Sequence, residues 1–255
     1  MNTMIKICKR IVGGGMVDNI DKYPFMATLW YLDGSEFSFK SGAVYIGKKF
    51  FLTAAHCVKD RDPERTLIRM GSCRINGLPE TMRVVRVYKH PQFNTSNLRN
   101  DIAIVEVDKE PSDKYFPVRL PCNHLVNHCY NVGDKVIVLG FGKENTRNGS
   151  QQHLENLKEV QLRIRRLSDT RYNRRIITQD MFLAGNYENG IVMDACTGDS
   201  GGPCIKLIKG NWVVVGIVSW GNGCGKIQYP GVYTKVLSYN TWIRQICGFS
   251  PCTNH

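Results

Sequence analysis

Ser200 lies in a run of residues that suits a nucleophile. The run reads Gly198-Asp199-Ser200-Gly201-Gly202-Pro203. Glycines on both sides expose the hydroxyl and let the backbone adopt unusual turns. They also let a substrate carbonyl approach backbone N–H groups, which then stabilise a developing negative charge. The whole run therefore predicts acyl-transfer chemistry, whereas a bare Gly-x-Ser-Gly would indicate only a turn between strands.

A serine hydroxyl is a weak nucleophile and needs a base. His56, in Thr53-Ala54-Ala55-His56-Cys57, is a candidate base, and Asp101, in Asn100-Asp101-Ile102, is a candidate for the carboxylate that orients it. Taken singly, His56 could be a hydrogen-bonded core residue and Asp101 could cap a strand. The chain order His, Asp, Ser, carried by three extended motifs, favours a catalytic triad over these explanations.

The elements that must position these residues are short strands. Apolar and β-branched segments recur along the chain, separated by Gly, Asn, Asp and Pro clusters, which is typical of an all-β sandwich or barrel. His56 follows one such segment, and Asp101 precedes another. Residues 160–165 alternate between apolar and polar side chains, as expected for a strand with one face in solvent.

Two segments depart from this pattern. Near the C-terminus, Ser238 could cap a helix that places Trp242, Ile243 and Ile246 on one face. Residues 109–129 are rich in Pro, Asn and polar residues, and we interpret them as a linker between two β units.

The composition is that of a folded, basic protein. The 255 residues include 34 Lys and Arg against 22 Asp and Glu, a formal net charge of +12. A dense arginine run, residues 163–175, is either a solvated surface or an exosite for a polyanion. No RNA-binding aromatic motif, helix-turn-helix or zinc-finger spacing occurs, so a nucleic-acid or glycan binder would rest on charge alone.

Export is indicated by one feature and not by another. Ten cysteines favour an oxidising compartment, and we therefore expect a secreted protein. Residues 1–10, however, are too short for a secretory signal. No apolar run reaches about 18 residues, so no membrane span is expected.

Five motifs make the chain resemble the trypsin/chymotrypsin family. They are the histidine, aspartate and serine motifs, Ile11-Val12-Gly13-Gly14, and Ser219-Trp220-Gly221 with Pro230-Gly231-Val232-Tyr233. The resemblance implies two six-stranded antiparallel β-barrels with the active site between them and a C-terminal helix. It divides the chain into an activation leader, residues 1–10, and a peptidase domain, residues 11–255. Barrel 1 would cover about 24–115, barrel 2 about 130–236 and the helix about 238–247.

The resemblance also implies roles for the triad residues. His56 would take the proton of Ser200 and return it to the leaving amine, while Asp101 holds the tautomer of His56. The backbone N–H groups of Gly198 and Ser200 would form the oxyanion hole, and Ser219 would support Asp101 from the second barrel.

Substrate preference follows from the same resemblance. The implied substrate-binding positions are Asp194, Ala195, Ser219, Trp220, Gly221 and Gly231. Asp194 would form the floor of a pocket for Arg or Lys, because a buried carboxylate needs a cation. Ala195 replaces a serine that is common there, which should favour Arg, since Arg can pair bidentately with the carboxylate.

Activation by cleavage after Arg10 is implied as well. The new N-terminus, Ile11, would insert and pair with Asp199, which orders the pocket. Among the cysteines, the resemblance implies a disulfide between Cys196 and Cys224 and leaves Cys57 without its usual partner. The pairing of the remaining cysteines cannot be deduced from their spacing.

These observations lead to a zymogen of a trypsin-like serine endopeptidase, a hydrolase that cleaves after Arg, or less readily after Lys. The competing hypothesis is a non-catalytic homologue that binds a partner through the same fold. Protein or peptide substrates and protein inhibitors are the expected partners, and a monomer is the default. The loop of residues 71–80 corresponds to a calcium-binding loop in some members of the family that the chain resembles. It carries a single carboxylate, Glu80, whereas calcium needs several oxygen ligands, so we expect no calcium. We also expect no other metal and no cofactor.

Overall fold

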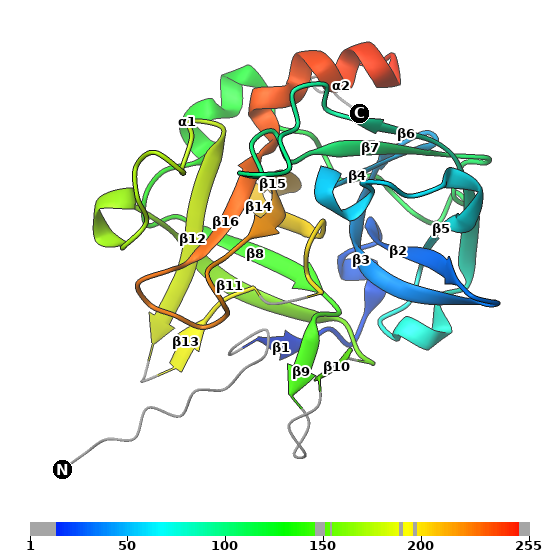
Figure 1. Ribbon diagram of the computed structural model, residues 1–255, viewed down its shortest axis with the longest axis horizontal. Coiled ribbons are helices and arrows are strands. Elements are labelled where there is room, and N and C mark those ends of the chain that lie inside the picture. Colours follow the sequence, from blue (N-terminus) through cyan, green and yellow to red (C-terminus); the bar gives the residue numbers. More distant parts are fainter. Residues whose placement is uncertain (1–13, 146–150, 154, 189–190, 196–197, 250–255) are drawn as a thin grey trace.

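The first half of the chain folds into a closed barrel of six antiparallel strands (Figure 1). The computed structural model describes residues 14–145, 151–153, 155–188, 191–195 and 198–249. The strands pair in the order β2-β3-β4-β7-β6-β5. They are β2 Met26–Asp33, β3 Glu36–Gly47, β4 Phe50–Thr53, β5 Thr66–Met70, β6 Glu80–Lys89 and β7 Ala103–Val107.

The second half forms another barrel of six antiparallel strands. The sheet runs β11-β8-β14-β15-β16-β12 and closes because β11 also pairs with β12. The strands are β8 Lys135–Gly140, β11 Lys158–Arg165, β12 Met181–Glu188, β14 Pro203–Ile208, β15 Asn211–Trp220 and β16 Gly231–Lys235. In β11, Val160, Leu162 and Ile164 are buried while Gln161 and Arg163 are exposed, as the alternation predicted. The all-β, two-barrel fold class is confirmed.

Smaller elements complete the described part of the chain. β1 Gly15–Met16 lies beside β11, β9 Lys143–Asn145 pairs with β10 Gln151–His153, and β13 Ile191–Met193 pairs with β12. The α-helices in this part are α1 Val126–Cys129 and α2 Asn240–Cys247. No helix in the same part is long and apolar enough to cross a membrane.

The predicted cap of the C-terminal helix is wrong. Ser238 lies inside a 3₁₀ turn, Val236–Tyr239, and α2 begins after it, at Asn240, without a side-chain cap. The turn already runs into the helix, so the serine hydroxyl is not at the helix start. The predicted apolar face is confirmed, because Ile243 is buried and Trp242 packs against the core. The segment predicted as a linker, residues 109–129, ends in the short helix α1.

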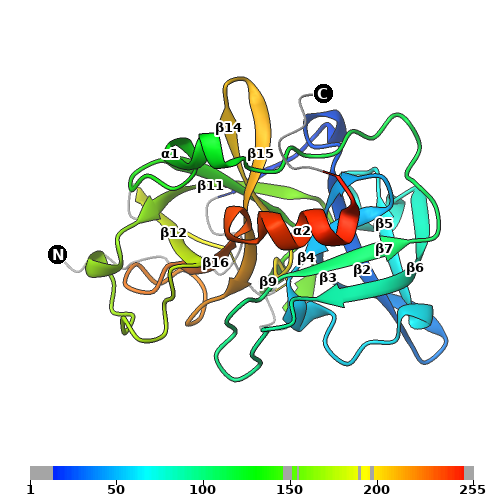
Figure 2. The same ribbon diagram turned by 90° about the horizontal axis from the view of Figure 1, so that it is seen from above.

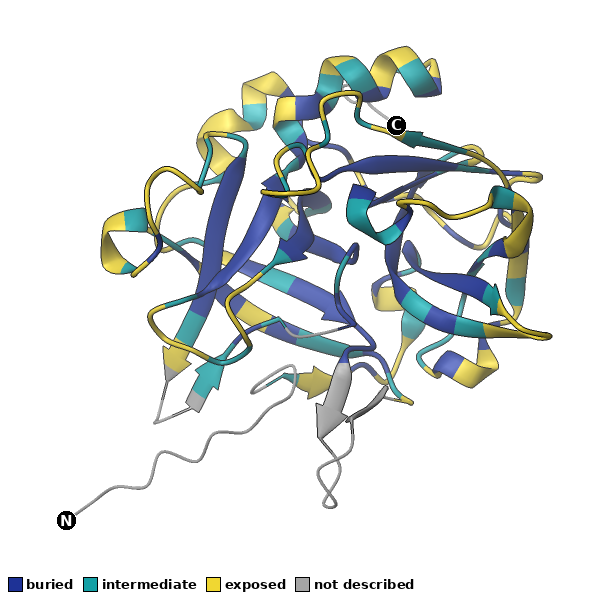
Figure 3. Cartoon of the chain, viewed as in Figure 1, coloured by how far each residue is buried: buried dark blue, intermediate teal, exposed yellow. Residues whose placement is uncertain are grey.

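Buried residues line both barrels (Figure 3), and the apolar core of barrel 1 continues into the second half of the chain, beside a separate apolar cluster in barrel 2. The apolar cluster of barrel 1 includes Leu139, which lies near the end of β8, and Phe141, which follows β8. Phe39 of β3 meets Phe141 edge to face, with 6.1 Å between ring centroids. Helix α2 lies across the junction, as the view from above shows (Figure 2). The surfaces that face each other therefore come from residues far apart in the sequence.

Candidate active site

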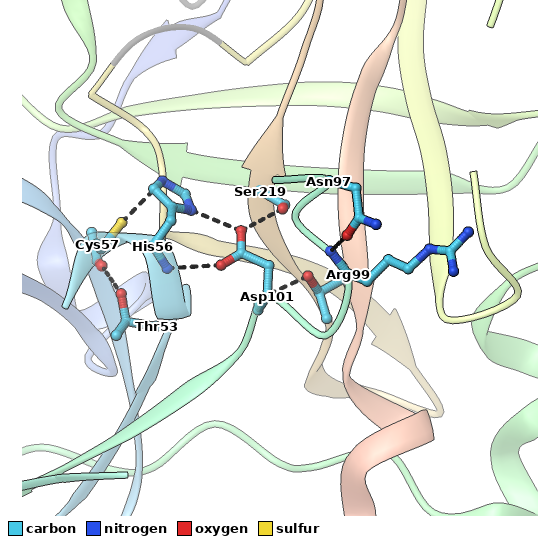
Figure 4. Close-up of polar contacts among 9 residues, drawn as sticks. Thr53, His56, Cys57, Asn97, Arg99, Asp101 and Ser219 are labelled. Atoms are coloured by element: carbon cyan, nitrogen blue, oxygen red, sulfur yellow. Dashed lines mark hydrogen bonds and ion pairs between the residues drawn. The ribbon is translucent and has the colours of Figure 1, made fainter. Parts of the chain in front are cut away.

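Asp101 and His56 form a tight pair. Asp101 is fully buried two residues before the start of β7, and its Oδ2 lies 2.7 Å from Nδ1 of His56 (Figure 4). The backbone N–H of His56 donates to the other carboxylate oxygen at 2.9 Å. Ser219, near the end of β15, donates its hydroxyl to Oδ2 at 2.5 Å. A carboxylate that accepts here places the proton on Nδ1, which leaves Nε2 as the site for a proton in transit.

Strand pairing in barrel 1 brings the two residues together. The strands β4 and β7 pair with Thr53 opposite Ala103, so the end of β4 lies beside the start of β7. His56 follows in a 3₁₀ turn, Ala55–Cys57, and Asp101 comes two residues before Ala103. Barrel 2 adds a second support, since Thr234 of β16 donates to the carbonyl oxygen of Asp101 at 2.9 Å.

Burial and the polar neighbours act on the pKa of His56 in opposite directions. Burial lowers the pKa of His56, but the hydrogen bond to Asp101 and the contact with Cys57 outweigh it and raise this pKa to about 10. The Cys57 Sγ lies 3.4 Å from His56 Nε2. Nε2 is thus occupied by a thiol in this structure, a contact that the sequence did not predict.

The backbone of Ser200 is seated on barrel 1. Its carbonyl oxygen accepts the N–H of Gly42 at 2.9 Å. A β-carbon on Gly201 would lie 2.2 Å from Thr53 Oγ1, so the serine turn packs against the strand that leads to His56. Among the described residues, the Ser200 hydroxyl makes no hydrogen bond to His56. The structure therefore brings His56, Asp101 and Ser219 together and places the Ser200 backbone beside them.

The turn before Ser200 is shaped by a glycine and a buried acid. Gly198 has a φ of 97°, which favours glycine. Asp199 is fully buried, and its carboxylate accepts the N–H of Gly142 at 2.9 Å. β-Carbons on Gly140 and Gly142 would lie 2.1 Å and 2.6 Å from Asp199 Oδ1, so only glycine fits there.

Asp194 is a buried carboxylate without a cation. It is 2 % exposed, and its oxygens accept the N–H groups of Gly225 at 3.1 Å and Gly231 at 3.2 Å. Burial raises the pKa of Asp194 to about 7, although these N–H groups oppose the shift. No Lys, Arg or His in the described part of the chain forms an ion pair with it.

Tyr233 adds a second unsatisfied group at this place. Its hydroxyl is buried and has no hydrogen-bond partner among the described residues. A β-carbon on Gly231 would lie 3.0 Å from both this hydroxyl and Asp194 Oδ1, so the two groups flank the glycine. No role for Tyr233 was predicted from the sequence. The signal was available, because residues two apart on a strand point to the same face.

Two aromatic rings form a wall nearby. Trp220 meets Tyr172 edge to face, with 5.4 Å between ring centroids. The Tyr172 hydroxyl donates to the carbonyl of Pro230 and accepts the N–H of Asn222, each at 3.1 Å. A β-carbon on Gly221 would lie 3.4 Å from the carbonyl oxygen of Gly223, so it would be in van der Waals contact there. No sequence motif marked Tyr172.

Some predicted residues lie outside the described part of the chain. They are Arg10, Ile11 and Cys196. Cys224 is disulfide-bonded, while Cys57 is a free thiol, as expected from its missing partner. No group of three His, Cys, Asp or Glu side chains in the described residues could hold a metal ion.

The family model for trypsin matches residues 11–243 of the chain. This protein belongs to the trypsin family. A trypsin-family chain with two closed barrels has the chymotrypsin fold, and the family is one of serine proteases. The pairing of His56 with Asp101 across the ends of β4 and β7 lies within the matched range.

Curated relatives agree with this membership. Vitamin K-dependent protein C of Rattus norvegicus is 31 % identical over 252 residues, 96 % of this chain and 53 % of the relative. Complement factor I of Rattus norvegicus is 34 % identical over 247 residues, 94 % of this chain and 39 % of the relative. Mannan-binding lectin serine protease 1 of Mus musculus is 34 % identical over 251 residues, 88 % of this chain and 34 % of the relative. The trypsin-family chain thus spans about a third to a half of these relatives.

Proposed function

We propose that this protein is a serine endopeptidase that cleaves after Arg, or less readily after Lys, with Ser200, His56 and Asp101 as its triad. The observation that carries the proposal is the buried, cation-free carboxylate of Asp194 beside the unpartnered hydroxyl of Tyr233. A buried charge is costly until a cation meets it, so a substrate guanidinium or ammonium gains most from this pocket.

In the proposed reaction, His56 Nε2 accepts the proton of Ser200 as the hydroxyl oxygen attacks the peptide carbonyl. Asp101 holds the imidazole and stabilises its charged form, and the N–H groups of Gly198 and Ser200 bind the oxyanion. Return of the proton to the amine releases the first product. Water then hydrolyses the acyl group on Ser200 by the same steps in reverse order.

The preference for Arg rests on two features. The Asp194 oxygens accept the backbone N–H groups of Gly225 and Gly231 and meet no cation among the described residues, so a planar guanidinium can pair with them bidentately. Ala195 supplies no hydroxyl that would hold a water for the shorter Lys side chain. Ser219, Trp220, Gly221 and Gly231 would line the path of the substrate.

We propose activation by cleavage between Arg10 and Ile11, with the freed ammonium pairing with Asp199. The support is the placement of the neighbouring groups. Asp199 is fully buried beside Gly142, and the chain from Gly15 already lies along β11. Pairing of the new ammonium with this buried carboxylate would order the serine turn.

The deciding experiment measures hydrolysis of a small chromogenic Arg substrate before and after cleavage at Arg10. We expect hydrolysis only after cleavage, slower turnover of the matched Lys substrate, and none in Ser200→Ala. A Ser200→Ala chain that is still cut after Arg10 would show that another protease makes the cut. No hydrolysis after complete cleavage would favour the alternative, a non-catalytic homologue that binds a partner.

A polyanion is a further proposed partner, and a groove on barrel 2 favours it. The groove measures about 560 Å³, and its lining includes Arg165, Arg166, Arg174 and Lys235. None of the four forms an ion pair within the described residues. We expect salt-sensitive binding to heparin that is lost when the three arginines become Gln and is kept when Arg83, on β6, becomes Gln.

We further propose that the protein is secreted and acts as a monomer on protein or peptide substrates. The disulfide at Cys224 supports an oxidising compartment. Detection of the cleaved chain in culture medium, with the mass of one copy by light scattering, would test both statements.

A further inference from the structure

Cys57 is a free thiol that contacts the candidate base. It follows His56 directly, is half-buried, and places its Sγ 3.4 Å from His56 Nε2 (Figure 4). Nε2 is the atom that must accept the proton of Ser200 in the proposed reaction. The thiol therefore contacts the atom that the proposed reaction needs for the serine proton.

The side chains behind the thiol form a complete relay. Cys57 contacts Nε2 of His56, and Nδ1 of His56 meets Asp101 at 2.7 Å. Ser219 donates to the same Asp101 oxygen at 2.5 Å. A nucleophile beside a base, with the base oriented by an acid, is the arrangement that activates a side chain for attack. A thiol needs less activation than a hydroxyl, since its thiolate forms more readily.

Four other free thiols of the described chain lack this setting. Burial raises the pKa of Cys129, Cys204 and Cys247, and these three are buried among apolar side chains. Cys73 is half-buried like Cys57, but burial also raises its pKa, and no imidazole contacts it. Cys73 is therefore a matched comparison for Cys57.

We propose that Cys57 is a covalent modification site, at which a low-molecular-weight disulfide such as glutathione disulfide reversibly switches off the peptidase. The inference rests on the proposed function of His56 as the base for Ser200. It requires a co-reactant from solution, and the half-exposed thiol is open to one.

The reaction is a thiol–disulfide exchange. His56 Nε2 takes the proton of the Cys57 thiol, and the thiolate attacks one sulfur of glutathione disulfide. The new bond joins Cys57 Sγ to that sulfur, and the disulfide bond of the co-reactant breaks. The leaving glutathione thiolate receives the proton from His56. The Cys57 sulfur is oxidised, and the departing sulfur is reduced.

The adduct blocks the step that needs Nε2. It attaches to a sulfur 3.4 Å from this nitrogen, so the added group lies against the atom that must receive the Ser200 proton. Loss of a general base lowers a rate by about 10²- to 10⁴-fold, which is the expected loss of kcat/KM in the modified fraction.

The first experiment measures modification without using activity. The full-length Ser200→Ala chain is treated with glutathione disulfide, and adducts are mapped by mass spectrometry over time. We expect Cys57 to react at least about ten times faster than Cys73, and His56→Gln to remove this advantage. Equal rates at Cys57 and Cys73, or no effect of His56→Gln, would overturn the inference.

The second experiment follows activity in the cleaved, Ser200-containing chain. We expect hydrolysis of an Arg substrate to fall in step with the adduct at Cys57 and to return with dithiothreitol. Cys57→Ala and, as a near-isosteric second variant, Cys57→Ser should each keep their own starting rate under treatment. Cys73→Ser should lose activity like the parent.

Full modification of Cys57 with unchanged activity would refute the switch. A chain that hydrolyses no Arg substrate before treatment would contradict the proposed function instead. In that case the modification rates at Cys57 and Cys73, with and without His56→Gln, still test whether His56 activates the Cys57 thiol.

Discussion

Replacing Asp194 by Asn removes a carboxylate that the fold holds at a cost. Burial raises the pKa of Asp194 from 3.8 to about 7, against the opposing backbone N–H groups. The folded-state pKa lies above the unfolded one, so the stability that this group contributes is present below 3.8 and is lost as the pH rises through about 7. Between about pH 5 and about pH 8 the loss amounts to about 2–3 kcal/mol.

Asn does not titrate, so the substitution should become more favourable by that amount over the same pH range. At low pH the substitution should raise the free energy of unfolding little, or lower it. The amide nitrogen of Asn would face the N–H group of Gly225 or Gly231, which donates a hydrogen bond to the carboxylate of Asp194. Urea unfolding in a Ser200→Ala background, followed by tryptophan fluorescence, measures the change in unfolding free energy. Asp60→Asn, at an exposed side chain, is the control.

The reasoning would be refuted if Asp194→Asn and Asp60→Asn showed the same pH dependence. Activity gives an independent readout in the Ser200-containing chain. There, Asp194→Asn should lower kcat/KM for an Arg substrate far more than for a substrate with a neutral residue in that position, because only the cation needs the carboxylate.

Three further substitutions test the geometry of the site. Gly201→Ala would place a β-carbon 2.2 Å from Thr53 Oγ1 at a φ of 76°, so kcat/KM should fall by at least about 100-fold while far-UV circular dichroism stays unchanged. Ser219→Ala removes the 2.5 Å hydrogen bond to Asp101, and kcat should fall by about 10-fold with KM little changed; a change in KM alone would contradict a role through Asp101. Ala195→Ser should raise turnover of Lys relative to Arg substrates, and an unchanged ratio in matched assays would sink the proposed preference.

The strands and the candidate acid and base could be predicted from the sequence because local patterns carry them, whereas the division into two barrels came from the resemblance to the family. Strand alternation in residues 160–165 and the position of Asp101 before a buried strand are visible in short windows. The cap at Ser238 failed for a local reason too, since a 3₁₀ turn and an α-helix have similar sequence preferences and the chain joins them there.

Contacts between distant segments could not be predicted in the same way. The Tyr172 hydroxyl meets Pro230 and Asn222 across two loops, and no spacing rule reports such a meeting. The contact of Cys57 with His56 depends on side-chain torsions, which neighbouring letters in the sequence do not determine. The hydroxyl of Tyr233 lies across Gly231 from the carboxylate of Asp194, and only the folded structure shows that the two groups flank the same glycine.

The meeting of Gly42 with Gly202 has a consequence for how this chain can evolve. A β-carbon on Gly42 would lie 2.6 Å from the Gly202 α-carbon, so the main chains of the two halves touch without any side chain between them. Because backbone atoms make this contact, no substitution of a neighbouring side chain could make room for a β-carbon on either glycine. In a deep mutational library selected for hydrolysis, codons 42 and 202 should stay glycine even where whole strands around them drift.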